Sequence, residues 1–106
     1  MIACSTEQVL VVLTGPPALE GQLIDWLLLR EDGQGFSTSA VNGHSTKHDH
    51  LSIAEQVSGR QRRVQFQVQL ERSHLEEFMK ELVTDFPGAD LHYWAIPLLA
   101  GGHLRD

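Results

Sequence analysis

The clearest pattern in the chain is an alternation of apolar and polar residues over residues 60–71. Val64, Phe66, Val68 and Leu70 alternate with Arg63, Gln65, Gln67 and Gln69. A period of two residues predicts a β-strand with one apolar and one polar face, because successive side chains point to opposite sides of a strand. Lys, Glu and Thr are commoner than Gln on a strand face that is exposed to water. This polar face therefore either packs against another subunit or is an ordinary solvated sheet face.

Three further segments have the length and composition of strands. They are the Val/Leu-rich run 7–14, the segment 36–42 and the aromatic-rich segment 90–96, which precedes Pro97. A short continuous apolar run such as 7–14 is typical of a central strand that is buried on both faces. Because proline cannot donate to a strand ladder, we expect Pro97 to end the last strand.

Two segments have the spacing of amphipathic helices. The first, over about 17–31, places Leu19, Leu23, Ile24, Trp26, Leu27, Leu28 and Arg30 on one stripe; the second repeats Leu75, Phe78, Met79, Leu82, Val83 and Phe86. Ser73-His74-Leu75-Glu76 has the pattern of a capping box at the start of the second helix. Glycines 33 and 35 are expected to end the first helix, and Pro87-Gly88 the second. Glu76, Glu77 and Glu81 are expected on the solvated outer face of the second helix.

The order of these elements predicts the fold. Strand, helix, strand, a long loop, and again strand, helix, strand give an α+β, ferredoxin-like split βαβ fold, in which two helices cover one face of a four-stranded antiparallel sheet. We expect one domain over residues 1–106, with its core at about 7–97, the long loop at about 43–59 and a tail at 98–106. The second sheet face is left to water or to another subunit.

Composition and charge exclude several classes of protein. Eight Lys and Arg against fourteen Asp and Glu give a net charge of −6, which is unsuited to binding nucleic acid or an anionic membrane through charge. A single cysteine, Cys4, excludes an intramolecular disulfide. No apolar run approaches the roughly 20 residues that span a bilayer, and the start of the chain has no secretion signal. We therefore expect a cytoplasmic protein without membrane insertion.

The long loop holds the candidate metal ligands His44, His48, Asp49 and His50. Imidazole is the usual ligand of divalent transition metals, and a carboxylate can complete such a site. His92 and His103 could add ligands from a neighbouring subunit. The alternative is a solvated loop whose histidines have no role. Because the segment is polar and has few large apolar anchors, we expect residues 44–58 to be mobile without a ligand.

Arg60, Arg62 and Arg63 form a basic cluster in an acidic chain. Such a cluster could bind an anion such as a nucleotide phosphate. The alternative is ion pairing with Glu55, Glu71 or an acid of a neighbouring subunit.

The chain has no convincing catalytic arrangement. The phosphate-binding motif G-x-x-x-x-G-K, a paired cysteine motif and the motif H-E-x-x-H are all missing, and the serines lack a nucleophile-elbow context. We therefore expect that the protein is not an enzyme.

Three segments resemble the PII signal-transduction proteins, the nitrogen regulatory family. Residues 35–43, GFSTSAVNG, resemble the PII segment that leads into the T-loop, the long loop between strands two and three. Residues 59–66, GRQRRVQF, resemble the return strand, and residues 87–97 lie where PII has its B-loop and last strand. Together with the helix sequence IDWLLLRED, these segments more closely resemble a small proteobacterial branch of uncharacterised PII-like proteins, often encoded beside heavy-metal efflux pumps of the RND type.

The resemblance implies a homotrimer whose sheets face one another and whose T-loop contacts a membrane transporter, here a heavy-metal RND efflux pump. The loop residues that would make this contact are Gly43, His44, Ser45, Lys47, Leu51, Ile53 and Gly59. A metal or a small ligand would switch the loop between order and disorder. The alternative is a metal-binding chaperone or buffer of CutA-like fold, which would use the loop histidines without a client.

The chain departs from the PII pattern in two places. PII proteins bind ATP or ADP with a B-loop that holds several glycines and a lysine, whereas residues 84–93, TDFPGADLHY, hold one glycine and no lysine. Because a phosphate site needs convergent N–H groups and cations, we expect ATP to bind weakly or not at all in this way. The modified T-loop tyrosine is also missing, since the only tyrosine is Tyr93; this excludes uridylylation at that site.

Overall fold

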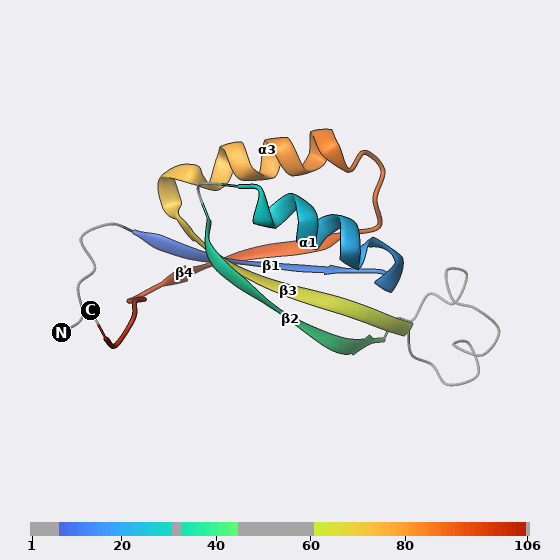
Figure 1. The fold of residues 1–106 in the computed structure, drawn as a ribbon, viewed down its shortest axis with the longest axis horizontal. Coiled ribbons are helices and arrows are strands. Elements are labelled where there is room, and N and C mark those ends of the chain that lie inside the picture. The colour runs from blue at the N-terminus through green and yellow to red at the C-terminus, as the bar shows by residue number, and fades with distance from the viewer. Residues whose placement is uncertain (1–6, 31–32, 45–60, 106) are drawn as a thin grey trace.

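The computed structural model describes residues 7–30, 33–44 and 61–105. Within these residues the elements follow one another as β1 (Gln8–Gly15), α1 (Glu20–Leu28), β2 (Gly33–Gly43), β3 (Gln61–Glu71), α3 (Leu75–Asp85) and β4 (His92–Leu98) (Figure 1). A 3-10 turn precedes each helix, at Pro17–Leu19 and at Arg72–His74. The predicted order of strands and helices is confirmed.

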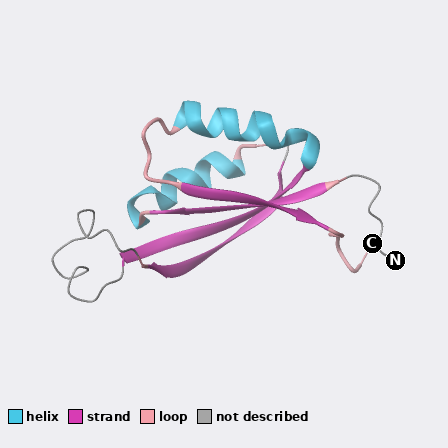
Figure 2. Ribbon diagram, turned by 180° about the vertical axis from the view of Figure 1, so that it is seen from behind, coloured by secondary structure: helices cyan, strands magenta, loops and turns pink. Residues whose placement is uncertain are grey.

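The four strands form one antiparallel sheet in the order β2-β3-β1-β4. Both helices lie on the same side of this sheet, as the view from behind in Figure 2 also shows. This is the predicted ferredoxin-like fold. None of the helices in the described ranges is long and apolar enough to cross a membrane.

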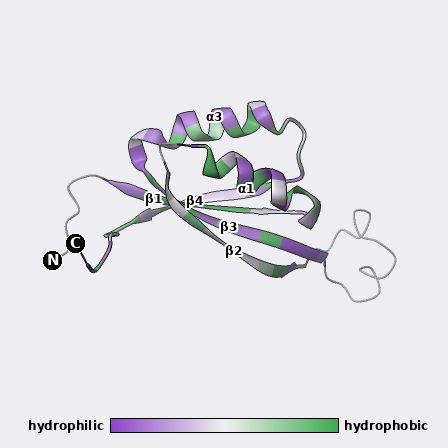
Figure 3. Ribbon diagram, in the orientation of Figure 1, coloured by the Kyte–Doolittle hydropathy of each residue, from purple (hydrophilic) through white to green (hydrophobic). Residues whose placement is uncertain are grey.

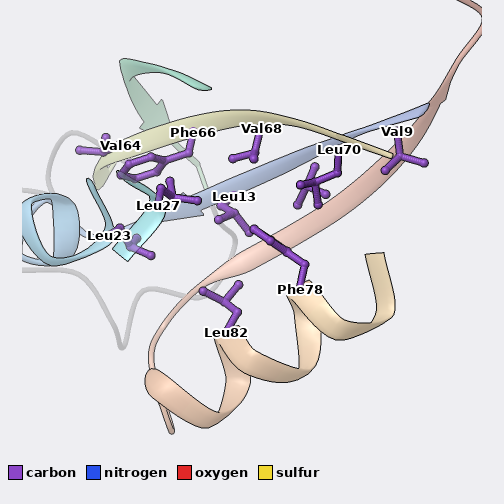
Figure 4. Packing of buried hydrophobic residues seen from close by; sticks show 11 residues of the cluster. Val9, Leu13, Leu23, Leu27, Val64, Phe66, Val68, Leu70, Phe78 and Leu82 are labelled. Carbon is purple, nitrogen blue, oxygen red and sulfur yellow. The ribbon is translucent and has the colours of Figure 1, made fainter. Parts of the chain in front are cut away.

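The core lies between the sheet and the two helices. Its buried members are Val9, Val11, Leu13, Leu23, Leu27, Val64, Phe66, Val68, Leu70, Phe78 and Leu82. Phe78 and Leu82 point from α3 toward the sheet (Figure 4). Val11 lies opposite Val68, and Leu13 opposite Phe66, so the apolar residues of both strands face the helices together. The period-two pattern therefore identified this face correctly.

Arg30, two residues after the end of α1, links the two helices. Its Nη1 lies 2.5 Å from Glu81 Oε2 on α3, and its guanidinium carbon lies 4.6 Å from the Trp26 ring centroid. Trp26 Nε1 in turn donates a hydrogen bond of 2.7 Å to Asp85 Oδ2. The prediction that Glu81 is simply solvated was wrong, because the long Arg30 side chain reaches it from the neighbouring helix.

The predicted capping box is not formed. The first turn before α3 is a 3-10 turn that contains Ser73, and no side chain caps the helix. Glu76 is bound instead by Arg72, whose Nη1 lies 2.8 Å from its Oε1. This hydrogen bond is the main reason why the pKa of Glu76 is lowered. The backbone N–H of Glu76 itself is the second cause of this lowered pKa.

Helix boundaries and faces also differ from prediction in places. The helix α1 ends at Leu28, and Gly33 and Gly35 lie within β2 rather than in a helix cap. Figure 3 shows hydrophilic and hydrophobic positions on the same turns of α3. Leu28 is 68% exposed and Val83 66% exposed, so both lie outside the buried stripe. A short helix on a narrow sheet buries only the centre of a wide apolar stripe.

The last strand runs through Pro97 instead of ending before it. Pro97 lies opposite Val9, inside β4. A proline is tolerated here because β4 is an edge strand of the sheet, where an N–H can point away from the ladder without loss. Trp94 is 51% exposed because it lies opposite Val12, on the sheet face away from the helices.

Two glycines give a matched test of this backbone. Gly88 follows α3 with a φ of 69°, a left-handed conformation that costs other residues about 1–2 kcal/mol. Gly21 lies in α1 with open space around its Cα, so alanine should stabilise the helix there by about 0.5–1 kcal/mol. We expect Gly88→Ala to lower and Gly21→Ala to raise the free energy of unfolding in urea. Shifts in the same direction for both variants would contradict this description of the turn.

Candidate functional site

Polar residues from separate segments meet at the end of the sheet where β2 ends and β3 begins. Arg63 of β3 donates from Nη2 to Asp90 Oδ2, at 2.9 Å, and to Gln61 Oε1, at 2.6 Å. His92 Nε2 lies 3.8 Å from the other carboxylate oxygen of Asp90. We refer to Arg63, Asp90, Gln61 and His92 as the arginine site.

The strand register explains how these residues meet. Val64 lies opposite Gly15, the last residue of β1, so Arg63 is one residue beyond the end of that strand. His92 lies opposite Thr14 in the last pair of the β1–β4 ladder. Asp90 comes two residues before His92, so it lies beyond the end of this ladder. The side chains of β3 and of the turn before β4 can therefore approach each other past the end of β1.

Two glycines make room for this approach. A side chain at Gly15 would overlap the side chain of Leu91, which follows Asp90. A Cβ at Gly43 would lie 3.3 Å from Arg63 Cγ, closer than ordinary contact. The missing side chains let the Asp90–Leu91 segment lie close to β1 and let the arginine stem lie close to β2.

The environment of Arg63 is unusual for a cation. Its side chain is only 8% exposed, while that of its partner Asp90 is 58% exposed. The second terminal nitrogen, Nη1, is buried and has no hydrogen-bond partner among the described residues. A buried donor without a partner is costly, and a charged one more so, which makes this nitrogen a place where a ligand would be favoured.

The predicted arginine cluster does not converge on one site. Arg62 and Arg63 are neighbours on β3, so their side chains point to opposite faces of the sheet. Arg62 is exposed and lies opposite Asn42, whereas the buried Arg63 lies opposite Val41. Arg60 and Glu55 lie outside the described residues. The predicted partner Glu71 lies at the far end of β3, opposite Gln8, so the expected pairing was wrong for Arg63, whose partner is Asp90.

Most of the predicted loop site also lies outside the described residues. This is the case for Ser45, Lys47, His48, Asp49, His50, Leu51, Ile53 and Gly59. Gly43 is the last residue of β2, and His44 follows it as an exposed residue. In the part of the chain that the structure describes, no three His, Cys, Asp or Glu residues lie together as a metal site would require.

The sheet face away from the helices, the open face, has an apolar and a polar half. Leu10 lies opposite Ile96 and Val12 opposite Trp94, which gives an apolar band across β1 and β4. Trp94 and Ile96 are 51% and 43% exposed. Gln65, Gln67 and Gln69 occupy the same face on β3, next to Ser37 and Ser39 of β2. The sequence predicted the glutamines but not the band, because 7–14 had no alternation to separate its two faces.

The open face is already partly organised by hydrogen bonds within the chain. Gln69 Nε2 donates to Gln8 Oε1 between β3 and β1. The tail after β4 returns over this pair, since a side chain at Gly101 would lie 2.7 Å from Gln8 Oε1. A hollow of about 280 Å³ adjoins the pair and is lined in part by Leu10, Ser37 and Gln67.

Comparison with known proteins places the chain among small α+β proteins. The chain is similar to a DUF3240 family protein from Shewanella baltica OS155, with 23% identity, a TM-score of 0.75 and coverage of 94% of this chain and 98% of that one. A putative PII-like signaling protein from Thermus thermophilus has 13% identity and a TM-score of 0.62, over 88% of each chain. CutA1 from a psychrotrophic Shewanella species has 16% identity and a TM-score of 0.69, over 94% of this chain and 88% of that one. No curated protein matches the sequence.

These structural likenesses, all under 25% identity, establish the fold and confirm that it is PII-like and CutA-like. The family assignment comes from the sequence. The model of a family described as a protein of unknown function, DUF3240, matches residues 5–105. Because this match covers nearly the whole chain, the protein belongs to the DUF3240 family.

Proposed function

We propose that the protein is a PII-like regulatory protein, a homotrimer that assembles through its open face and acts through the segment between β2 and β3 on a membrane transporter. The observation that carries this proposal is the open face itself. Its apolar band is formed by Leu10, Val12, Trp94 and Ile96, and no helix covers it in the described residues. Trp94 and Ile96 are the exposed part of this band. Exposed apolar side chains rimmed by polar residues are typical of a protein interface.

The composition of this face suits a contact between copies of the chain. Burying Trp94 and Ile96 would remove apolar surface from water at about 25 cal/mol per Å². The glutamines of β3 carry no charge and can both donate and accept hydrogen bonds, so they can be buried where they find amide partners. A face with charged residues in these positions would resist such assembly.

The two edges of the sheet support a closed ring. The β2 edge is 11 residues long, and its segment 36–42 has no charged residue or proline to discourage pairing. The β4 edge, on the other side of the sheet, is equally unpaired within the described residues. Pairing β2 of one subunit with β4 of the next would satisfy both edges, and such head-to-tail contacts form a ring when the rotation closes.

The proposed action on a client follows from the position of the long segment. Residues 44–60 connect Gly43 and Gln61, which lie opposite each other at one end of the sheet beside the arginine site. Binding of a ligand at this end can bias the conformation of the segment. We place the client contact on Gly43, His44, Ser45, Lys47, Leu51, Ile53 and Gly59. The resemblance to the proteobacterial branch suggests a heavy-metal RND efflux pump as the client.

The second candidate function is a metal-binding chaperone or buffer, which the likeness to CutA1 supports at the level of the fold. Both candidates are non-enzymatic, and both would use His44, His48, Asp49 and His50 as ligands. They differ in the client. Capture of the transporter from membranes by the purified protein, in a manner that depends on metal, would support regulation, and metal binding without capture would support a buffer.

The trimer is tested by mass. We expect light scattering at micromolar concentration to give three times the chain mass of 11.8 kDa. Trp94→Glu should lower the mass to that of a monomer, because it places a charge in the apolar band. Leu29→Glu is the matched control, since Leu29 is 84% exposed on the helix side and should leave the trimer intact. A monomeric wild type, or equal effects of both variants, would contradict the assembly.

The metal site is tested by calorimetry with zinc and with copper. The double variant His48→Ala, His50→Ala should lose at least tenfold in affinity, whereas Lys47→Ala in the same segment should not. Protons compete with the metal for neutral imidazole, so affinity should fall as the pH drops through about 6.5. Unchanged affinity in the histidine variant would exclude these ligands.

A further inference from the structure

Arg63 is held more firmly than its partner. Its side chain is more than nine-tenths buried, it lies in the space left by Gly43, and Gln61 accepts a hydrogen bond from it. Asp90 is more than half exposed and reaches the arginine through one oxygen. The exposed carboxylate can be solvated by water and is therefore the member that can leave, whereas the buried Arg63 charge then needs another anion as its partner.

The hydrogen bonding of Arg63 is incomplete in a particular way. A guanidinium can bind an oxyanion with two parallel hydrogen bonds, one from each terminal nitrogen. Here Asp90 Oδ2 binds only Nη2, while Asp90 Oδ1 lies toward His92. Nη1 stays buried and, within the described part of the chain, has no partner. Both donors of a bidentate oxyanion site are thus present, and Asp90 accepts a hydrogen bond from only one of them, Nη2.

We propose that Arg63 binds an oxyanion, a phosphate or carboxylate group, through Nη1 and Nη2, and that Asp90 is a built-in competitor that holds the site in the free protein. An incoming anion satisfies the buried Nη1 and displaces the Asp90 carboxylate. The segment Asp90–Leu91, which packs against Gly15, is then released from β3. The inference goes beyond the proposed function, since it requires neither a trimer nor a client.

The same reasoning explains why an aspartate at this position does not exclude an anion site. An intramolecular carboxylate lowers the apparent affinity for a ligand by the fraction of time that it occupies the donors. The free protein therefore binds anions weakly, while a ligand with a second attachment point elsewhere on this end of the sheet would displace Asp90 effectively.

The test measures binding of inorganic phosphate, and separately of succinate, by calorimetry at constant ionic strength. Asp90→Asn keeps the shape of the side chain but removes its charge, so affinity for at least one probe should rise tenfold or more. The matched control Asp25→Asn removes one negative charge from an exposed position on α1 and should leave affinity unchanged. Whichever probe gains more identifies the class of the oxyanion.

The role of Arg63 is tested in the Asp90→Asn background. Adding Arg63→Gln should abolish the gained binding. Should that variant not fold, Arg63→Lys is the second variant. It keeps the charge but lacks the two parallel N–H donors of the guanidinium, so it should lose most of the affinity gained by Asp90→Asn. The proposal is overturned by unchanged anion affinity in Asp90→Asn, by an equal rise in affinity in Asp25→Asn, or by full binding in the Arg63 variants. An acid of a neighbouring subunit on Nη1 would give the first of these results. Light scattering on the same samples reports the oligomeric state independently.

Discussion

The constraint on which this structure depends is that two short helices cover one face of a four-stranded sheet and leave the other face open. Val9, Val11 and Leu13 of β1 enter the core beneath the helices. The intervening residues Leu10 and Val12 point the other way, beside Trp94 and Ile96 of β4. A central strand that is apolar on both faces needs cover on both, and in the described residues the helices supply it on one.

The same sheet creates the arginine site. β1 ends at Gly15, opposite Val64, whereas β3 already starts at Gln61 and so extends past the end of β1. Side chains from both neighbours of β1 can therefore enter the space beyond its end. Arg63 and Asp90 meet there, and small residues at 15 and 43 allow them to do so. The open face and the arginine site are therefore two consequences of one arrangement, in which the long segment between β2 and β3 leaves from the same end.

The fold was predictable because its signals are local and periodic. The alternation along Val64–Leu70 and the helical spacing that includes Phe78 and Leu82 each identified the side chains that form the core. Predictions failed where a contact or a position in the sheet that the periodicity does not encode decided the outcome. Arg72 binds the carboxylate of Glu76 that the capping box required, Arg30 crosses from another helix to Glu81, and Pro97 is tolerated because β4 is an edge.

The site was harder to predict for the same reason. Arg63 was among the candidates because basic residues are scarce in this chain, but its neighbours Arg60 and Arg62 could not be separated from it without the strand register. Asp90 was not singled out as a site residue, although it lies in the segment 84–93 that departs from the PII pattern. Its pairing with Arg63 links positions 27 residues apart and depends on where β1 ends, which the apolar run 7–14 does not reveal.

The central claim is that other copies of the chain cover the open face and both free edges of this sheet. The most direct measurement is the hydrogen exchange of the backbone amides of β2 and β4 that point away from their pairing strands. The account predicts that the outward amides over residues 36–42 of β2 and 92–96 of β4 are protected at micromolar concentration and lose protection together on dilution. Rapid exchange of these amides at all concentrations, with the inward amides protected, would show an uncovered sheet and contradict the account.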